Sequence, residues 1–137
     1  MRKLLIIALV AAIAGCATTA PDSESIGPKP VNYENDIRSQ IKTTFFDPYS
    51  LRDVSISEPM ATGTVFDGAT PFPHSGWLVC MRANGKNRMG AYTGLQTTVF
   101  LFKDGSLDLT LSGPEYSGQI ESHCAAGQFR DFKPQLG

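Results

Sequence analysis

The chain has 137 residues, of which 42% are hydrophobic and 18% are charged. This composition suits one globular domain and excludes a collagen-like or broadly disordered chain. The formal net charge is −1, and removal of Arg2 and Lys3 with a signal segment leaves 10 basic side chains against 13 acidic ones. A mildly acidic surface gives no general electrostatic reason to bind nucleic acid, so that class of partner is set aside.

The first fifteen residues predict a signal peptide. Met1–Lys3 is a short basic start, and the apolar run that follows covers Leu4–Ala14. This run is too short to cross a bilayer as a helix, which takes about 20 residues. A basic start followed by an apolar run of this length is typical of a secretory signal peptide, here over residues 1–15.

The end of the apolar run, Ile13-Ala14-Gly15-Cys16, resembles the bacterial lipobox. The resemblance implies that Cys16 is lipidated, carries acyl chains such as palmitate, and becomes the mature N-terminus. Two or more acyl chains hold a protein stably on a bilayer. Ala17 rather than Asp follows the cysteine, which favours the periplasmic face of the outer membrane. The alternative is ordinary cleavage after Ala14, which would give a secreted or soluble periplasmic protein.

The three cysteines are consistent with an exported protein. Cys80 and Cys124 are expected to form a disulfide in an oxidising compartment, which leaves Cys16 for lipidation. The alternative is that Cys80 and Cys124 are two buried free thiols.

A spacer is expected between the lipid and the domain. Residues 17–31 contain three prolines and almost no large apolar side chain. Residues 16–31 are therefore predicted to be the lipidated cysteine and a flexible tether, with a disordered terminus of no positioning role as the alternative. A single compact domain is expected over residues 32–137.

The domain begins with a helical pattern. Apolar residues recur at every fourth position: Tyr33, Ile37, Ile41 and Phe45. This spacing predicts a helix over residues 33–46 with one apolar stripe. Asn32 is a favourable N-cap residue, and Asp47-Pro48 should end the helix because proline restricts the residue before it.

The rest of the chain predicts strands, expected at residues 51–58, 64–66, 76–83, 96–103 and 106–111. Asp104-Gly105 favours a type I′ turn, so residues 96–111 are predicted to form a β-hairpin. The expected core pairs are Phe102 with Leu107, Phe100 with Leu109, and Thr98 with Leu111. The predicted fold class is α+β, with one N-terminal helix packed on a small antiparallel sheet.

Motifs for chemistry are sparse. His74 and His123 are far apart and have no ligand spacing, so neither a metal site nor a cofactor is expected. The glycine-containing nucleophile elbow and the phosphate-binding loops are absent from the sequence. The chain is predicted not to be an enzyme. The enzyme alternative would need a cleft in which Asp or Glu residues meet one of the two histidines.

A glycine-rich loop is expected over residues 84–94. The candidate binding residues in and beside this loop are Arg82, Lys86, Asn87, Arg88 and Tyr92. Their donors and one aromatic ring could receive an anionic headgroup, a glycan strand or an acidic protein edge. The alternative is a solvated basic loop whose Asn and Gly residues serve turns. Phe72, between two prolines, is the expected exposed apolar contact.

Several short motifs resemble a group of small exported bacterial lipoproteins of unknown function. They are the DP-x-S step at Asp47–Ser50, Val79-Cys80, Asn84–Asn87, Gly90 and Tyr92–Gly94. The resemblance implies a domain type and brings no catalytic residues. We therefore expect a membrane-anchored, non-catalytic structural or interaction component of the envelope, whose partner is an unidentified protein or glycan. The alternative is a binding module that inhibits a cell-wall-degrading enzyme or recognises an anionic envelope ligand through residues 82–94.

Overall fold

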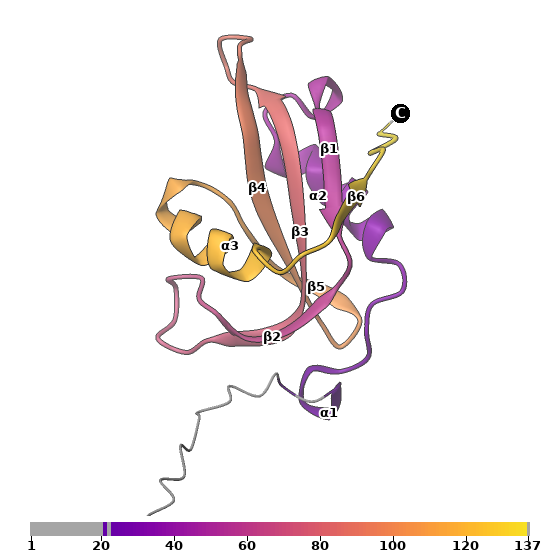
Figure 1. Ribbon diagram of the computed structural model, residues 1–137, viewed down its shortest axis with the longest axis vertical. Coiled ribbons are helices and arrows are strands. Elements are labelled where there is room, and N and C mark those ends of the chain that lie inside the picture. Colours follow the sequence, from indigo (N-terminus) through magenta and orange to yellow (C-terminus); the bar gives the residue numbers. More distant parts are fainter. Residues whose placement is uncertain (1–20, 22, 137) are drawn as a thin grey trace, which may run out of the picture.

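The computed structural model describes residues 21 and 23–136, so the predicted signal peptide and Cys16 lie outside the described residues. The predicted α+β class is confirmed, because an N-terminal helix packs on an antiparallel sheet (Figure 1). The described elements are α1 (Ser23–Ile26), α2 (Tyr33–Thr44), β1 (Arg52–Ser57), β2 (Met60–Val65), β3 (His74–Lys86), β4 (Tyr92–Lys103), β5 (Ser106–Leu111), α3 (Ser117–Cys124) and β6 (Phe129–Asp131), with 3₁₀ turns at Pro48–Ser50 and Pro114–Tyr116.

Strand β3 is the centre of the sheet. The strand order is β5-β4-β3-β1-β6, and β2 also pairs with β3. One edge of β3 pairs with β4, and the other pairs with β1 and β2 in succession. Between these two stretches, the backbone N–H of Cys80 donates to Ser57 Oγ at 2.9 Å. This hydroxyl satisfies a buried donor where the partner strand changes.

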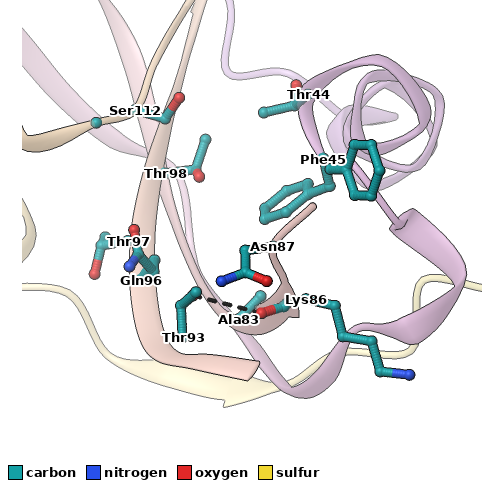
Figure 2. A pocket seen from close by; sticks show the side chains of 13 residues that line it. Thr44, Phe45, Ala83, Lys86, Asn87, Thr93, Gln96, Thr97, Thr98 and Ser112 are labelled. Carbon is teal, nitrogen blue, oxygen red and sulfur yellow. Dashed lines mark hydrogen bonds between the residues drawn. The ribbon is translucent and has the colours of Figure 1, made fainter. Parts of the chain in front are cut away.

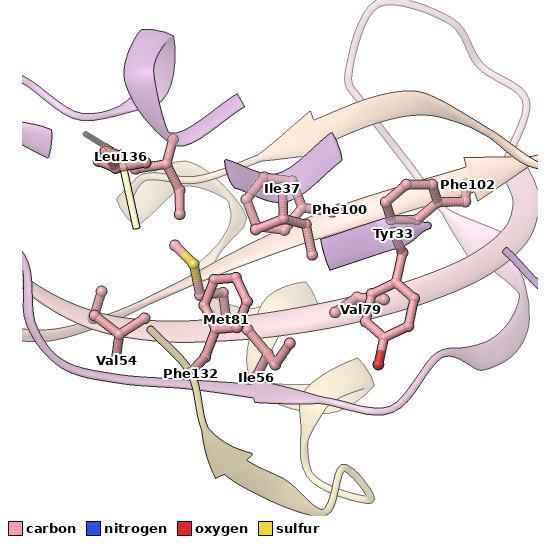
Figure 3. Close-up of a cluster of buried hydrophobic side chains, with 12 residues drawn as sticks. Tyr33, Ile37, Val54, Ile56, Val79, Met81, Phe100, Phe102, Phe132 and Leu136 are labelled. Carbon is pink, nitrogen blue, oxygen red and sulfur yellow. The ribbon is translucent and has the colours of Figure 1, made fainter. Parts of the chain in front are cut away.

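One face of the sheet is covered by α2 (Figure 3). The predicted helical stripe is confirmed, because Tyr33, Ile37 and Ile41 are buried. They join strand residues and the C-terminal segment in one core: Val54, Ile56, Val79, Met81, Ala83, Phe100, Phe102, Phe132 and Leu136. The helix ends at Thr44, two residues earlier than predicted. Its first turn is capped by the Asn32 backbone carbonyl rather than by the Asn32 side chain.

The opposite face is covered by α3, a helix that the sequence pattern did not predict. Ile120 and Cys124 are its buried residues. They complete a second core with Val65, Leu78, Cys80, Val99, Leu101 and Leu111. Cys80 and Cys124 form a disulfide, with their Cα atoms 5.9 Å apart. The bridge therefore ties α3 to the central strand.

The predicted hairpin is present, but its register was predicted correctly only next to the turn. Asp104 and Gly105 both have positive φ, at 51° and 81°, as a type I′ turn requires. Phe102 pairs with Leu107 as expected. Beyond that pair the register shifts by one, which gives Leu101–Leu109, Phe100–Thr110 and Val99–Leu111. Asp108 is the extra residue of this bulge, and its carboxylate turns toward His74.

The predicted tether is wrong in its second half. Ile26 is fully buried, and its carbonyl accepts the backbone N–H of Asp104 at 3.3 Å. The next carbonyl, of Gly27, accepts the indole N–H of Trp77 at 3.0 Å. Buried Ile26 and Pro30 and these two hydrogen bonds help to hold residues 23–31 on the sheet. The folded domain begins near Ser23 rather than at Asn32.

The disulfide yields a stability prediction. Replacing both cysteines (Cys80→Ala with Cys124→Ala) should lower the free energy of unfolding by up to about 4 kcal/mol, because the bridge spans 44 residues. Urea unfolding would measure this in a Cys16→Ser background, which also serves as the bridged control. Equal unfolding midpoints for the two chains would contradict the prediction.

Candidate functional site

The end of the β3–β4 hairpin is a short, internally bonded tip, defined as residues 87–91. The side-chain Oδ1 of Asn87 accepts the backbone N–H groups of Met89 and Ala91 at 3.0 and 3.1 Å. The backbone N–H of Asn87 donates to the Ala91 carbonyl at 2.9 Å, and that of Gly90 donates to the Asn87 carbonyl at 3.0 Å. These four hydrogen bonds fix the tip backbone.

This fixed backbone presents two side chains to solvent. Met89 is 91% exposed, the most exposed of the large apolar side chains that the structure describes. The guanidinium carbon of Arg88 lies 5.4 Å from the centre of the Phe46 ring, which is itself 62% exposed. An exposed methionine on a rigid loop contributes nothing to the core. Exposed apolar side chains of this kind often mark contact sites.

The base of the hairpin is built around Tyr92. The guanidinium carbon of Arg52 lies 3.6 Å from the ring centre, and the Lys86 ammonium lies 5.4 Å from it. The Tyr92 hydroxyl donates to the Ser50 carbonyl at 2.9 Å. Cation–π contacts of this type contribute about 0.5–1 kcal/mol at exposed sites. Tyr92 therefore ties the hairpin to Ser50 and to Arg52 at the start of β1, while its contact with Lys86 lies within the hairpin.

The predicted loop over residues 84–94 is wrong in extent, because β3 continues to Lys86 and β4 begins at Tyr92. The five candidate residues do not converge. Arg82 lies on β3 with its guanidinium carbon 3.7 Å from the centre of the Phe129 ring, on the face covered by α3. Asn87 and Arg88 belong to the tip. A single anion-binding cluster is not formed by these cations.

A groove beside the tip, here called the α2-side hollow, has a volume of about 320 Å³ (Figure 2). It lies between the end of α2 and the strands β3 and β4. In Figure 2 the Lys86 ammonium points away from it. Apart from Lys86, the lining residues are uncharged, and they supply hydroxyl and amide groups beside two aromatic rings. They include Thr44, Phe45, Phe46, Asn87, Thr93, Gln96, Thr97, Thr98 and Ser112. Such a surface suits a neutral, hydrogen-bonding ligand.

A partly exposed ion cluster joins α2 to the sheet. Arg130 donates to Glu34, to Glu58 at 3.1 Å, and to the Tyr33 hydroxyl at 2.9 Å. The hydrogen bond from Arg130 lowers the pKa of Glu34, whereas burial raises the pKa of Tyr33. These groups connect α2 with β6 and the end of β1. Their contacts are with one another rather than with an open cavity.

His74 meets two carboxylates, which is one part of the condition set for the enzyme alternative; the other part is a cleft. Its Nε2 lies 3.1 Å from Asp67 Oδ2 and its Nδ1 lies 3.4 Å from Asp108 Oδ2. The backbone N–H groups of Ala69 and Thr70, followed by His74, lower the pKa of Asp67. These contacts close the β2–β3 loop. None of these three residues lines the α2-side hollow.

Phe72, the predicted exposed apolar contact, is 74% exposed in the β2–β3 loop. The partly buried Trp77 packs against the core under α2. Within residues 23–136, no group of three or more His, Cys, Asp or Glu side chains is arranged to hold a metal ion. None of the helices in the described part of the chain is long and apolar enough to cross a membrane.

Sequence reasoning missed the α2-side hollow and the role of Met89. The hollow is assembled from residues near 45, 87, 97 and 112, which no local pattern connects. The one available signal was the adjacent pair Phe45-Phe46 just before the helix stop.

No known protein family, curated protein or solved structure matches the chain.

The tip geometry predicts a local effect of one substitution. Asn87→Ala should make amide hydrogen exchange at Met89 and Ala91 about five- to tenfold faster, because both N–H groups lose their acceptor. Asn87→Asp keeps an acceptor oxygen and is the matched control. Unchanged exchange in the alanine variant would show that the side chain does not order the tip.

Proposed function

We propose that the protein is a bacterial envelope lipoprotein, held on the periplasmic face of the outer membrane by an acylated Cys16. The lipobox-like Ile13–Cys16 sequence supports this placement. The disulfide supports it further, because the bridge uses the other two cysteines of the chain and leaves Cys16 with no partner thiol. Lipidation gives that sulfur a role in an oxidising compartment.

The domain acts by contact rather than by catalysis, and the hairpin tip is its contact surface. The observation that carries this proposal is the pre-ordered tip, in which four hydrogen bonds hold the 91%-exposed Met89 in place. A loop that is already ordered loses little conformational entropy when it binds. Methionine and arginine are both favoured at protein interfaces. The expected partner is therefore an envelope protein.

The orientation of the domain supports the same use. The tip is at the upper end of the long axis in Figure 1, and α1 is at the lower end. A chain anchored through its N-terminus would therefore present the tip away from the bilayer. Partners that are not themselves at the membrane surface could reach it.

A second candidate function is inhibition of a cell-wall-degrading enzyme, and the shape of the tip favours it. A narrow projecting loop with one unbranched apolar side chain can enter an active-site cleft. Inhibition of wall-degrading activity in an envelope extract by the soluble Cys16→Ser chain would support this role over that of a structural contact.

Lipid attachment predicts the location of the chain. The parent protein should be in the membrane fraction, whereas Cys16→Ser should be in the soluble periplasmic fraction, because it lacks the thioether-linked acyl chains. Mass spectrometry of the mature N-terminus provides a direct check. A mature chain that begins at Gly15 with an unmodified Cys16 would contradict the placement and support ordinary cleavage.

The tip predicts a loss of partner binding. A photo-crosslinking residue at position 89 should capture a partner in cells, and Arg88→Glu combined with Met89→Asp should reduce recovery of that partner about tenfold or more. Lys103→Glu, at the opposite end of β4, is the charge control and should retain the partner. Equal recovery with the tip variant would refute the tip as the contact surface.

A further inference from the structure

Strand β4 is longer than its neighbour β5, and half of its outer edge is unpaired. β5 pairs with β4 only from Val99 to Lys103. On the other side, β3 pairs with β4 as far back as Tyr92. In the part of the chain that the structure describes, no strand pairs with the β5-side edge of residues 92–98.

The register shows which backbone groups face this free edge. Lys103 pairs with Ser106 next to the two-residue turn, so its backbone polar groups point toward β5. Because these groups alternate along a strand, those of Thr97 and Leu95 point the same way. Gly94 fits the alternation, since its N–H turns inward and donates to Asn84 Oδ1 at 3.0 Å. The free edge therefore offers the N–H and C=O groups of Leu95 and Thr97.

A sharp turn explains why β5 does not cover this edge. Gly113 has a φ of +105°, which L side chains rarely adopt, and Pro114 follows it. A side-chain carbon on Gly113 would also lie 2.6 Å from Glu115 Oε2. The chain leaves the sheet at this point and enters α3.

Two hollows flank the free edge on opposite faces of the sheet. The α2-side hollow is the groove described above. The α3-side hollow, of about 380 Å³, lies under α3 and is lined by Leu95, Pro114, Ser117, Ile120 and Glu121 among others. Both hollows share Gln96, Thr97 and Gly113. A strand added to this edge would place alternate side chains in one hollow and then the other.

The α3-side hollow carries negative charge. Glu121 lines it, and the Glu115 carboxylate lies against Gly113, at its margin. Neither carboxylate forms an ion pair with a basic side chain among the described residues. Leu95, Ile120 and Pro114 supply apolar surface beside them. A lysine or arginine fits this combination, because its stem packs on apolar groups while its charge meets the carboxylates.

We propose that the free edge of β4 binds an extended peptide segment of a partner protein as an added strand. The peptide places basic side chains in the α3-side hollow and neutral polar side chains in the α2-side hollow. Backbone hydrogen bonds to Leu95 and Thr97 supply affinity, and the two hollows supply selectivity. This site shares Asn87 with the hairpin tip but includes neither Arg88 nor Met89, and it does not depend on the function proposed for the tip.

Charge favours a basic partner over a second copy of this chain. Two β4 edges paired about a two-fold axis perpendicular to the sheet would place both α3 faces on the same side. Glu115 and Glu121 of each copy would then face those of the other. Four like charges at one interface disfavour that assembly.

The test peptide is an acetylated octapeptide of alternating lysine and threonine. Its binding to the soluble Cys16→Ser chain is measured by fluorescence anisotropy. The control peptide has the same composition with the residues in pairs, which distributes lysines over both faces. We expect the alternating peptide to bind about tenfold more tightly, with amide chemical-shift changes centred on residues 93–97. Equal binding of the two peptides would mean only a non-specific charge attraction and would overturn the proposal.

Variants of the edge make the test specific. Thr97→Pro removes an outward N–H that β3 does not use and should weaken binding about tenfold, whereas Thr97→Val keeps the N–H and should not. Glu121→Gln should weaken binding severalfold. The tip variant Arg88→Glu with Met89→Asp should bind the peptide like the parent. Unchanged binding by Thr97→Pro would refute strand addition at this edge.

Two further measurements complete the design. A peptide methylated at alternate backbone nitrogens loses its strand hydrogen bonds and should fail to bind the parent chain, so a decisive result does not require Thr97→Pro to fold. Sedimentation of the parent chain without peptide should show a monomer. A dimer that Thr97→Pro dissociates would assign the edge to a second copy and overturn the peptide proposal.

Discussion

The structure depends on a central strand that is apolar on both faces. Val79 and Met81 of β3 point to one core, while Leu78 and Cys80 point to the other. A strand of this kind must be covered twice, because either exposed face would leave large apolar side chains in water. Helix α2 covers the first face through its own amphipathic stripe. Helix α3 has only eight residues and buries two of them, so its disulfide to β3 compensates for a small contact area.

Local patterns in the sequence predicted the elements that carry a strong periodicity or turn signal. The α2 stripe and the Asp104-Gly105 turn are of this kind, and both are present. The bulge at Asp108 was not predicted, because the turn pattern gives the register only next to the turn and does not show the contact of Asp108 with His74 on another strand. Helix α3 was not predicted, because its two buried residues are too few to produce a helical periodicity in the sequence. Residues 23–31 were predicted to be a tether because composition does not reveal that Ile26 and Pro30 are buried.

The candidate site shows the same division between local and distant information. The sequence pattern near residues 82–92 predicted one group of donors with one ring, but nearness in sequence did not bring all of these side chains together. Arg82 points to the α3 face and stacks on Phe129, while Lys86 and Arg52 contact Tyr92. Neighbouring side chains on a strand point to opposite faces of the sheet. Three of the cations, Arg52, Arg82 and Lys86, lie over aromatic rings. The features that remain available for a partner are the exposed Arg88 and Met89 side chains on an ordered turn and the backbone of an unpaired strand edge.

The packing of Ile26 and Gly27 against the sheet has a consequence for how the domain would sit on a bilayer. With acyl chains on Cys16, only seven peptide units separate the anchor from Ser23, where the fold begins. Their fully extended length is at most about 25 Å. The globular body could then neither drift far from the lipid headgroups nor sample a wide volume. The body of the domain would stay next to the membrane, and the hairpin tip would be the part that extends farthest from the bilayer.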